Sequence, residues 1–317
     1  MSVSRAAQPK RRYAPPGSGI RGLIAASLTP LKDDLSCDVD LLAQHCRGLL
    51  AAGCDGLALF GTTGEGPSFG VRERMDALDR LLAAGVPAER LLVGGSVPAL
   101  TDAGELARHA AANGCAGVFV MPPFYFKAVG EDGLVDWFAR VIECAPDTRF
   151  YLYNLPELAG VSLGYGVVAR LSERYPSTVV GLKDSSGDWP YTAGLLARFP
   201  DLDIFAGLET HVPGAMEKGA AGAISGLANV VPGLARGLCR GASEEPGSPL
   251  DRIRPLVEIV TRYPVVPALR AMQAHLSGDD RWTTPRPPLT PLPEAALRAL
   301  AAALDQARAV NERVASP

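Results

Sequence analysis

The stretch Val179-Val180-Gly181-Leu182-Lys183-Asp184-Ser185 is a short apolar run that ends on a lysine. Runs of this kind recur along the chain, and longer segments with the apolar spacing of amphipathic helices lie between them. Strands without polar alternation are typical of parallel sheets, in which both faces of a strand are buried. The stretch therefore predicts one strand of a parallel α/β fold.

Eight such strand–helix units predict a (β/α)8 barrel, the TIM-barrel class of α/β fold, in residues 20–243. The expected strands are Gly22–Ser27, Gly56–Gly61, Leu91–Gly95, Gly117–Met121, Phe150–Tyr153, Val179–Lys183, Asp203–Phe205 and Gly222–Ile224. The expected helices between them include Leu41–Ala52, Val71–Ala84, Ala103–Asn113, Gly133–Cys144 and His211–Lys218. An open, doubly wound sheet is the alternative, but no expected strand is followed by the GxGxxG turn of dinucleotide-binding folds.

Two further segments flank the predicted barrel. Residues 1–19 contain basic residues without an acid, followed by prolines and glycines. We expect a flexible tail here and no secretory signal, because no apolar segment follows the basic residues. In residues 244–317, prolines interrupt a helical pattern that includes Glu294–Val314. We expect this part to form a helical extension that packs against the barrel.

The composition excludes several classes of function. The 317 residues carry a net charge of −3, which gives no electrostatic reason to expect nucleic acid or an anionic membrane as a partner. No window has the roughly 18 apolar residues that a membrane span requires. The six cysteines form no CxxC pair, and Cys46, Cys54 and Cys115 lie among small apolar residues, so we expect buried thiols and neither disulfides nor a metal site. A cytoplasmic location fits best.

Lys183 is one of only five lysines in a chain with 26 arginines. Arginine stays protonated in proteins, whereas a lysine whose ammonium group is desolvated can lose its proton near neutral pH. The neutral amine can attack a ketone carbon and form a Schiff base. A solvated lysine just past a strand would have the same spacing, so the position alone leaves both interpretations open.

Other polar residues follow expected strands at the end where barrel enzymes gather their active sites. Thr62 and Thr63, in Gly61-Thr62-Thr63-Gly64-Glu65, can offer hydroxyl and backbone N–H groups to a carboxylate, or can cap a helix. Tyr153, in Tyr151-Leu152-Tyr153-Asn154-Leu155-Pro156, can relay a proton or can be a buried structural residue. The aromatic run Met121–Lys127 suits an interface as well as a site.

Together these motifs make the sequence similar to the dihydrodipicolinate synthase / N-acetylneuraminate lyase family of Schiff-base-forming lyases. The resemblance is carried by Gly61–Glu65, Tyr153–Pro156 and Gly181–Asp184, and it covers about residues 20–240. It implies that Lys183 holds pyruvate, or the pyruvyl part of a larger 2-oxo acid, as an imine, without a metal or an organic cofactor. It further implies the roles of the remaining site residues: Tyr153 as acid/base, Thr62 in its proton relay, Thr63 on the carboxylate, and Gly207 and Ile224 near the imine.

The resemblance also implies an assembly, because Tyr125 matches a tyrosine that family members insert into the neighbouring subunit's relay. A homo-oligomer follows, at least a dimer and commonly a tetramer. The sequence departs from the family's pyruvate–aspartate semialdehyde synthases at Leu158, where those enzymes carry an arginine for the second carboxylate. With a leucine at this position, the sequence looks more like the family's aldolases of 2-keto-3-deoxy sugar acids.

The expected function is therefore cleavage or formation of a C–C bond between pyruvate and an aldehyde, on a 2-keto-3-deoxy sugar acid or a related 4-hydroxy-2-oxo acid. Glu209, Ser185 and Thr210 are candidates for binding substrate hydroxyls. The alternatives are 4-hydroxy-tetrahydrodipicolinate synthase, a 2-keto-3-deoxy-acid dehydratase and N-acetylneuraminate lyase. A barrel that binds a 2-oxo acid without turning it over is the alternative from another class.

Overall fold

The computed structural model describes residues 19–241 and 247–315, with side chains described up to Ala309. The expected flexible tail lies outside the described residues except for Gly19. The cluster of basic residues in that tail, and residues 242–246 after the barrel, are likewise outside them.

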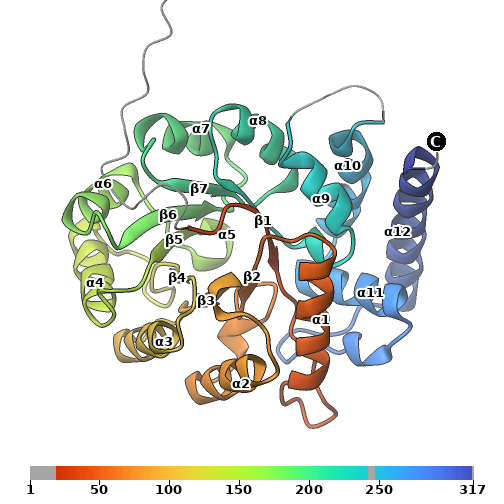
Figure 1. Ribbon diagram of the computed structural model, residues 1–317, viewed down its shortest axis with the longest axis horizontal. Helices are drawn as coiled ribbons and strands as arrows, with labels where there is room; N and C mark the ends of the chain where they lie inside the picture. The colour runs from red at the N-terminus through yellow and green to blue at the C-terminus, as the bar shows by residue number, and fades with distance from the viewer. Residues whose placement is uncertain (1–18, 242–246, 316–317) are drawn as a thin grey trace, which may run out of the picture.

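Eight parallel strands form a closed barrel in chain order, from β1 to β8 and back to β1 (Figure 1). Each begins at the residue that the sequence predicts and ends within two residues of the predicted end, so the (β/α)8 fold is confirmed. The strands are β1 (Gly22–Ala26), β2 (Gly56–Leu59), β3 (Leu91–Gly94), β4 (Gly117–Val120), β5 (Phe150–Asn154), β6 (Val179–Asp184), β7 (Asp203–Ala206) and β8 (Gly222–Ser225).

Helices surround the barrel (Figure 1). The longer helices have amphipathic spacing, and their buried apolar side chains pack in one cluster with those of the strands. The helices of the ring are α1 (Val39–Ala51), α2 (Val71–Ala83), α3 (Leu100–Ala112), α4 (Glu131–Glu143), α5 (Pro156–Ala159), α6 (Tyr165–Arg174), α7 (Trp189–Arg198), α8 (Val212–Glu217) and α9 (Pro232–Leu238). The expected helices are present, with ends shifted by at most three residues. The largest shift is at α3, which begins at Leu100 instead of Ala103.

The core has two layers. Inside the barrel, a cluster of side chains includes Phe119, Tyr151, Tyr153, Phe205 and Ile224, each no more than 2% exposed. A larger cluster lies between the strands and the helices. Complete burial of one large apolar side chain contributes about 1.5–3 kcal/mol, so these two layers dominate the stability of the barrel. The inner layer is a packed core, and the site must therefore lie at its end.

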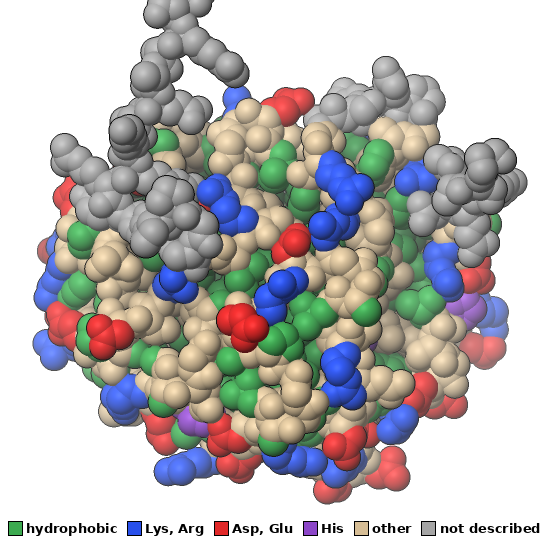
Figure 2. Space-filling model, in the orientation of Figure 1, with side chains coloured by type: hydrophobic (Ala, Val, Ile, Leu, Met, Phe, Trp, Pro, Cys, Tyr) green, Lys and Arg blue, Asp and Glu red, His purple; other side chains and the backbone are tan. Residues whose placement is uncertain are grey.

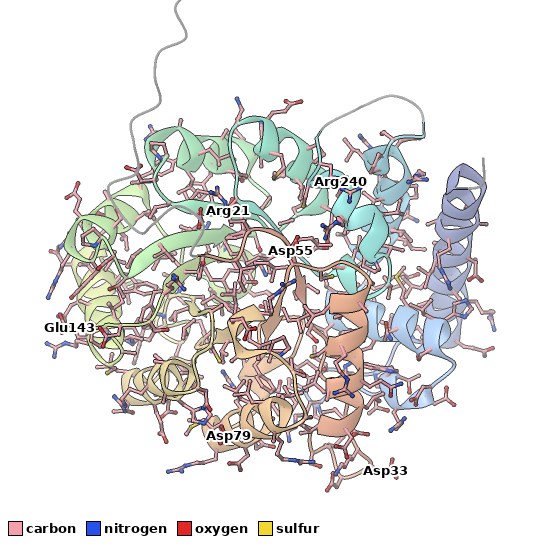
Figure 3. The ribbon with its side chains drawn as sticks, viewed as in Figure 1. Arg21, Asp33, Asp55, Asp79, Glu143 and Arg240 are labelled. Carbon is pink, nitrogen blue, oxygen red and sulfur yellow. The ribbon has the colours of Figure 1, made fainter. Side chains whose placement is uncertain are left out.

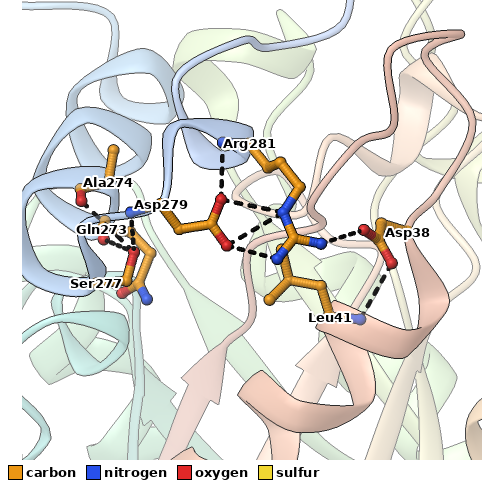
Figure 4. Close-up of polar contacts among 7 residues, drawn as sticks. All are labelled: Asp38, Leu41, Gln273, Ala274, Ser277, Asp279 and Arg281. Atoms are coloured by element: carbon orange, nitrogen blue, oxygen red, sulfur yellow. Dashed lines mark hydrogen bonds and ion pairs between the residues drawn. The ribbon is translucent and has the colours of Figure 1, made fainter.

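The C-terminal extension consists of α10 (Pro249–Val260), α11 (Val265–Ser277) and α12 (Glu294–Ala315), which lie along one side of the barrel (Figure 1). Its apolar side chains join the same buried cluster as those of the barrel helices. A polar contact adds to this packing: the Arg281 guanidinium donates to Asp38, the N-cap residue of α1, at 2.9 Å, and is also held by Asp279 (Figure 4). The extension therefore packs directly on the barrel.

On the face seen in Figure 2, cationic and anionic side chains are interspersed, in keeping with the small net charge of the chain. Among the described helices, none combines the length and the apolar content needed to cross a lipid bilayer.

Candidate active site

Lys183 and Tyr153 lie side by side at the ends of two neighbouring strands. They are paired in the register of β6 and β5, and both are buried, with 6% and 2% exposure. The Lys183 Nζ atom lies 4.4 Å from the centroid of the Tyr153 ring. No carboxylate in the described part of the chain forms an ion pair with this amine. The arrangement leaves a sheltered primary amine beside a phenol.

Thr62 joins this pair from the loop that follows β2. Its Oγ1 atom lies 3.2 Å from the Tyr153 hydroxyl, and either oxygen can donate the hydrogen bond. Amine, phenol and alcohol therefore come from three different strand ends. A proton can pass between the two hydroxyl groups without leaving the site.

A second polar layer fixes the two strands that carry the amine and the phenol. Asn154, which follows Tyr153, donates from Nδ2 to Oδ1 of Asp184, which follows Lys183, at 2.9 Å. Both side chains are buried, and the Asn154 amide oxygen accepts the Leu163 N–H at 3.0 Å. Thr192 donates to the other carboxylate oxygen of Asp184 at 2.6 Å. Both residues lie within the motifs Tyr153–Pro156 and Gly181–Asp184. The sequence indicated no role for them, because their contact depends on the register of β5 and β6.

Thr63 is half-buried beside Thr62, and its hydroxyl points toward Gly226, the residue after β8. The loop that carries both threonines is packed too tightly for side chains at its glycines: a Cβ atom on Gly66 would lie 1.8 Å from the Phe60 carbonyl oxygen. The backbone of this loop is therefore fixed by close contacts.

The other residues predicted to bind substrate lie at the same end of the barrel. Ile224 is buried in the inner layer, near the end of β8. Gly207 follows β7, and a Cβ atom at this position would lie 2.0 Å from the Ser185 hydroxyl and 2.8 Å from the Asp184 carbonyl oxygen. Ser185 therefore lies against Gly207, beside the strand end that carries Lys183.

Glu209 is buried and already has protein partners. One carboxylate oxygen accepts the Ser225 hydroxyl at 2.6 Å and the Leu227 N–H at 3.2 Å. These contacts join the end of β7 to the turn after β8. Glu209 thus has a structural role, and its contribution to substrate binding stays a prediction.

Three large apolar side chains are exposed on adjacent loops at this end. Tyr125 and Phe126, in the loop after β4, are 75% and 72% exposed, and their rings are in T-shaped contact at 5.2 Å. Leu158, in α5, is 61% exposed. Lys127 connects the two loops by donating to the Ala159 carbonyl at 2.8 Å. Within this chain, the structure does not bring Tyr125 to Tyr153.

A polar hollow lies at the opposite end of the barrel, where the strands begin. Its lining includes Arg21, Asp55, Arg90 and Arg149, and Figure 3 places Arg21 and Asp55 over the middle of the barrel. Because barrel enzymes carry their active sites at the carboxyl ends of the strands, we do not assign this hollow to the substrate.

The comparisons with known proteins fit this geometry. The model of the dihydrodipicolinate synthetase family matches residues 19–307. The chain belongs to this family. A DapA-like lyase of Chloroflexus aurantiacus is 34% identical over 290 residues, which cover 90% of this chain and 96% of the relative. The chain is therefore an enzyme of the lyase and aldolase class.

Two further relatives carry a synthase name. A 4-hydroxy-tetrahydrodipicolinate synthase of Parasynechococcus marenigrum is 31% identical over 281 residues, which cover 86% of this chain and 90% of the relative. The crystal structure of dihydrodipicolinate synthase from Agrobacterium tumefaciens superimposes with a TM-score of 0.85 at 36% identity and covers 90% of this chain and 98% of that one. The family resemblance inferred from the motifs is thus confirmed, while the substrate is left open.

Proposed function

We propose that this enzyme is a class I aldolase that joins or separates pyruvate and an aldehyde through an imine on Lys183. The observation that carries the proposal is the Lys183 amine, buried against the Tyr153 ring, with Thr62 at 3.2 Å from the Tyr153 hydroxyl. An amine so placed, without a carboxylate partner in the described chain, is positioned to attack a carbonyl carbon.

In the proposed cleavage, the neutral Nζ of Lys183 attacks C2 of the 2-oxo acid. The hydroxyl group formed at C2 takes a proton from the Tyr153–Thr62 pair and leaves as water, which gives an iminium ion. The proton of the C4 hydroxyl passes to the Tyr153–Thr62 pair as the C3–C4 bond breaks. The electrons of that bond enter the iminium, and an enamine and an aldehyde result. The enamine takes a proton at C3, and water releases pyruvate and the free amine. Synthesis runs through the same steps in reverse.

We infer that Thr63 and nearby backbone N–H groups hold the pyruvyl carboxylate, and that no metal or organic cofactor takes part. The chemistry of the residues supports this inference, since the iminium itself is the electron sink that such a cofactor would otherwise provide. Gly207, Ile224 and Ser185 would line the space around the imine, at the ends of β6, β7 and β8.

For the second substrate, we propose a hydroxylated aldehyde, so that the cleaved acid is a 2-keto-3-deoxy sugar acid or a related 4-hydroxy-2-oxo acid. Leu158 supports this choice, because an apolar side chain offers no charge-assisted hydrogen bond to a second carboxylate. Ser185 and Glu209, which follow the ends of β6 and β7, are the polar side chains that we propose for binding these hydroxyl groups.

A synthase that condenses pyruvate with aspartate semialdehyde is the second candidate. The 36% identity to the Agrobacterium dihydrodipicolinate synthase favours it. Leu158 favours the sugar-acid aldolase. One set of assays separates the candidates: pyruvate release from 2-keto-3-deoxygluconate, 4-hydroxy-2-oxoglutarate and N-acetylneuraminate, beside condensation with aspartate semialdehyde. A dehydratase would consume the first substrate without releasing pyruvate.

A test of the proposed chemistry does not require the aldehyde. Reversible enamine formation exchanges the methyl protons of pyruvate with solvent, so pyruvate in D2O should lose its methyl proton signal in the presence of the enzyme. A non-catalytic barrel that only binds the 2-oxo acid would leave the signal unchanged. Exchange that persists at the wild-type rate in Lys183→Arg would contradict the proposal.

We further propose a cytoplasmic homo-oligomer, at least a dimer, in which the exposed Tyr125 and Phe126 contact a second copy of the chain. Exposed apolar patches of this kind mark protein contacts more often than isolated surface residues do. Tyr125 would then complete the relay of the partner subunit.

A further inference from the structure

Glu65 has a backbone conformation that residues with a Cβ atom rarely adopt. Its φ angle is +53°, in the left-handed region that glycine adopts without steric cost. The residue is nevertheless a glutamate, and it is 2% exposed. Phe60, at the other end of the same loop, has the same φ of +53°. Thr62 and Thr63 thus lie between two strained residues, and strain of this kind persists only where surrounding contacts hold it.

The contacts that hold Glu65 come from the C-terminal extension. Arg270, in α11, donates from Nε to Oε1 of Glu65 at 2.6 Å, and both side chains have no exposed surface. The other carboxylate oxygen accepts the Arg286 N–H, also at 2.6 Å. Burial lowers the pKa of Arg270, and the neighbouring Glu65 carboxylate acts in the opposite direction by favouring the charged form.

Further hydrogen bonds connect this pair to the ends of β1 and β2. Arg270 donates to the Thr29 carbonyl, and the Thr29 hydroxyl donates to the Gly64 carbonyl at 2.8 Å. The Glu65 N–H donates to the Thr62 carbonyl at 3.0 Å, which closes the turn that presents the two threonine hydroxyls. A continuous chain of contacts therefore runs from α11 through Glu65 and Thr62 to the Tyr153 hydroxyl.

We propose that Glu65 and Arg270 are positioning residues, which hold the Thr62–Thr63 turn in its reactive conformation and make the C-terminal extension part of the active site. This inference rests on the proposed function of Thr62 and Thr63. The Arg270 guanidinium contacts one carboxylate oxygen, Oε1, through Nε and Nη2, and it also donates to the Thr29 carbonyl. Its rigid, planar set of donors thus holds Glu65 and the end of β1 together, which the single nitrogen of an ammonium group does not do.

The test uses the full-length enzyme and two variants that keep the charge, Arg270→Lys and Glu65→Asp. The matched control is Arg281→Gln, which removes a different ion pair between the extension and the barrel, at Asp38 and away from the turn (Figure 4). Circular dichroism and thermal melting establish that each variant is folded. Two conservative variants keep the test informative if one of them does not fold.

Activity is measured as the rate of hydrogen–deuterium exchange of the pyruvate methyl group. This rate is divided by the number of active sites that form a pyruvate adduct when borohydride is added, called trapped sites. Counting trapped sites separates positioning from a loss of folded enzyme. We expect Arg270→Lys and Glu65→Asp to lower exchange per trapped site at least tenfold and to raise the half-saturating pyruvate concentration severalfold, with Arg281→Gln within twofold of wild type. Values within twofold of wild type for both conservative variants would overturn the proposal.

Backbone hydrogen exchange of residues 60–69 gives a readout that does not depend on pyruvate chemistry. We expect this segment to exchange at least tenfold faster in the folded Arg270→Lys variant than in wild type or Arg281→Gln. If wild-type enzyme forms no borohydride-trapped adduct with pyruvate, the proposed function fails. The backbone exchange of residues 60–69 still decides whether Glu65 and Arg270 hold the turn in place. Unchanged exchange of the segment in the conservative variants would refute that role.

Discussion

Lys183 differs from the other described lysines in its surroundings. Lys32, Lys127 and Lys218 are exposed, whereas Lys183 is buried and faces an aromatic ring. Burial removes the water that would otherwise solvate an ammonium ion, and the adjacent phenol is within reach of groups bound to the same amine. The reactive character that we assign to this residue thus follows from its position at the end of β6.

Replacement of the two central residues should separate the nucleophile from the acid/base. We expect Lys183→Arg to lower pyruvate exchange at least about a thousandfold, since no imine can form. We expect Tyr153→Phe to lower it about 100- to 10,000-fold, because the phenol only moves a proton. Both variants should fold, as judged by circular dichroism. Wild-type exchange in either variant would remove that residue from the mechanism.

A substitution at a single residue, Leu158, tests the choice of the second substrate. An arginine at this position should add a charge-assisted hydrogen bond to a carboxylate. We expect Leu158→Arg to raise kcat/KM for condensation with aspartate semialdehyde about tenfold, while Leu158→Gln, which adds polarity without charge, changes it little. If wild-type enzyme already condenses this substrate faster than it cleaves any sugar acid, the synthase is the correct candidate.

At the scale of elements, the junction between β5 and β6 sets the geometry of the site. The Asn154–Asp184 hydrogen bond lies one residue beyond the Tyr153–Lys183 pair and links the side chains of the two strands at that register. Removal of Asn154 leaves the Leu163 N–H without its partner and takes one hydrogen bond from Oδ1 of Asp184, which keeps the Ser186 N–H at 3.2 Å. Each buried group left unsatisfied costs about 1–3 kcal/mol.

We therefore expect Asn154→Ala to lower the free energy of unfolding by about 2–4 kcal/mol, measured in urea, and to lower pyruvate exchange as well. Thr192→Val is the control, because it removes another hydrogen bond to Asp184 without touching the link between the strands. It should lower stability by about 1 kcal/mol and leave exchange per trapped site near the wild-type value. Equal losses of exchange in both variants would show that the link between the strands has no special role.

At the scale of the whole molecule, and among the residues that the structure describes, three of the four exposed large hydrophobic side chains lie beside the site: Tyr125 and Phe126 in the loop after β4, and Leu158 in α5. We expect wild-type protein to sediment as a dimer or a tetramer. The double variant Tyr125→Ser, Phe126→Ser should shift it toward the monomer and lower exchange. Val265→Ser, at the fourth such residue, is the control. A wild-type monomer with full activity would contradict this expectation.

The sequence predicted the barrel well because each apolar run is followed by a helical segment, and this local pattern determines both elements. It also placed Lys183, Tyr153 and Thr62 at strand ends, which the barrel brings together. It could not predict the Glu65–Arg270 pair, whose members are 205 positions apart, or the partners of Asn154. Such contacts depend on how the extension docks and on strand register, and neither leaves a local pattern.

The most direct test of the central claim is reduction of the wild-type enzyme with borohydride in the presence of pyruvate, followed by peptide mass mapping. With only five lysines in the chain, the modified residue can be assigned without ambiguity. We expect one carboxyethyl group per chain, located on Lys183, and none when pyruvate is omitted. A fully active enzyme with no adduct, or with the adduct on another lysine, would contradict the mechanism.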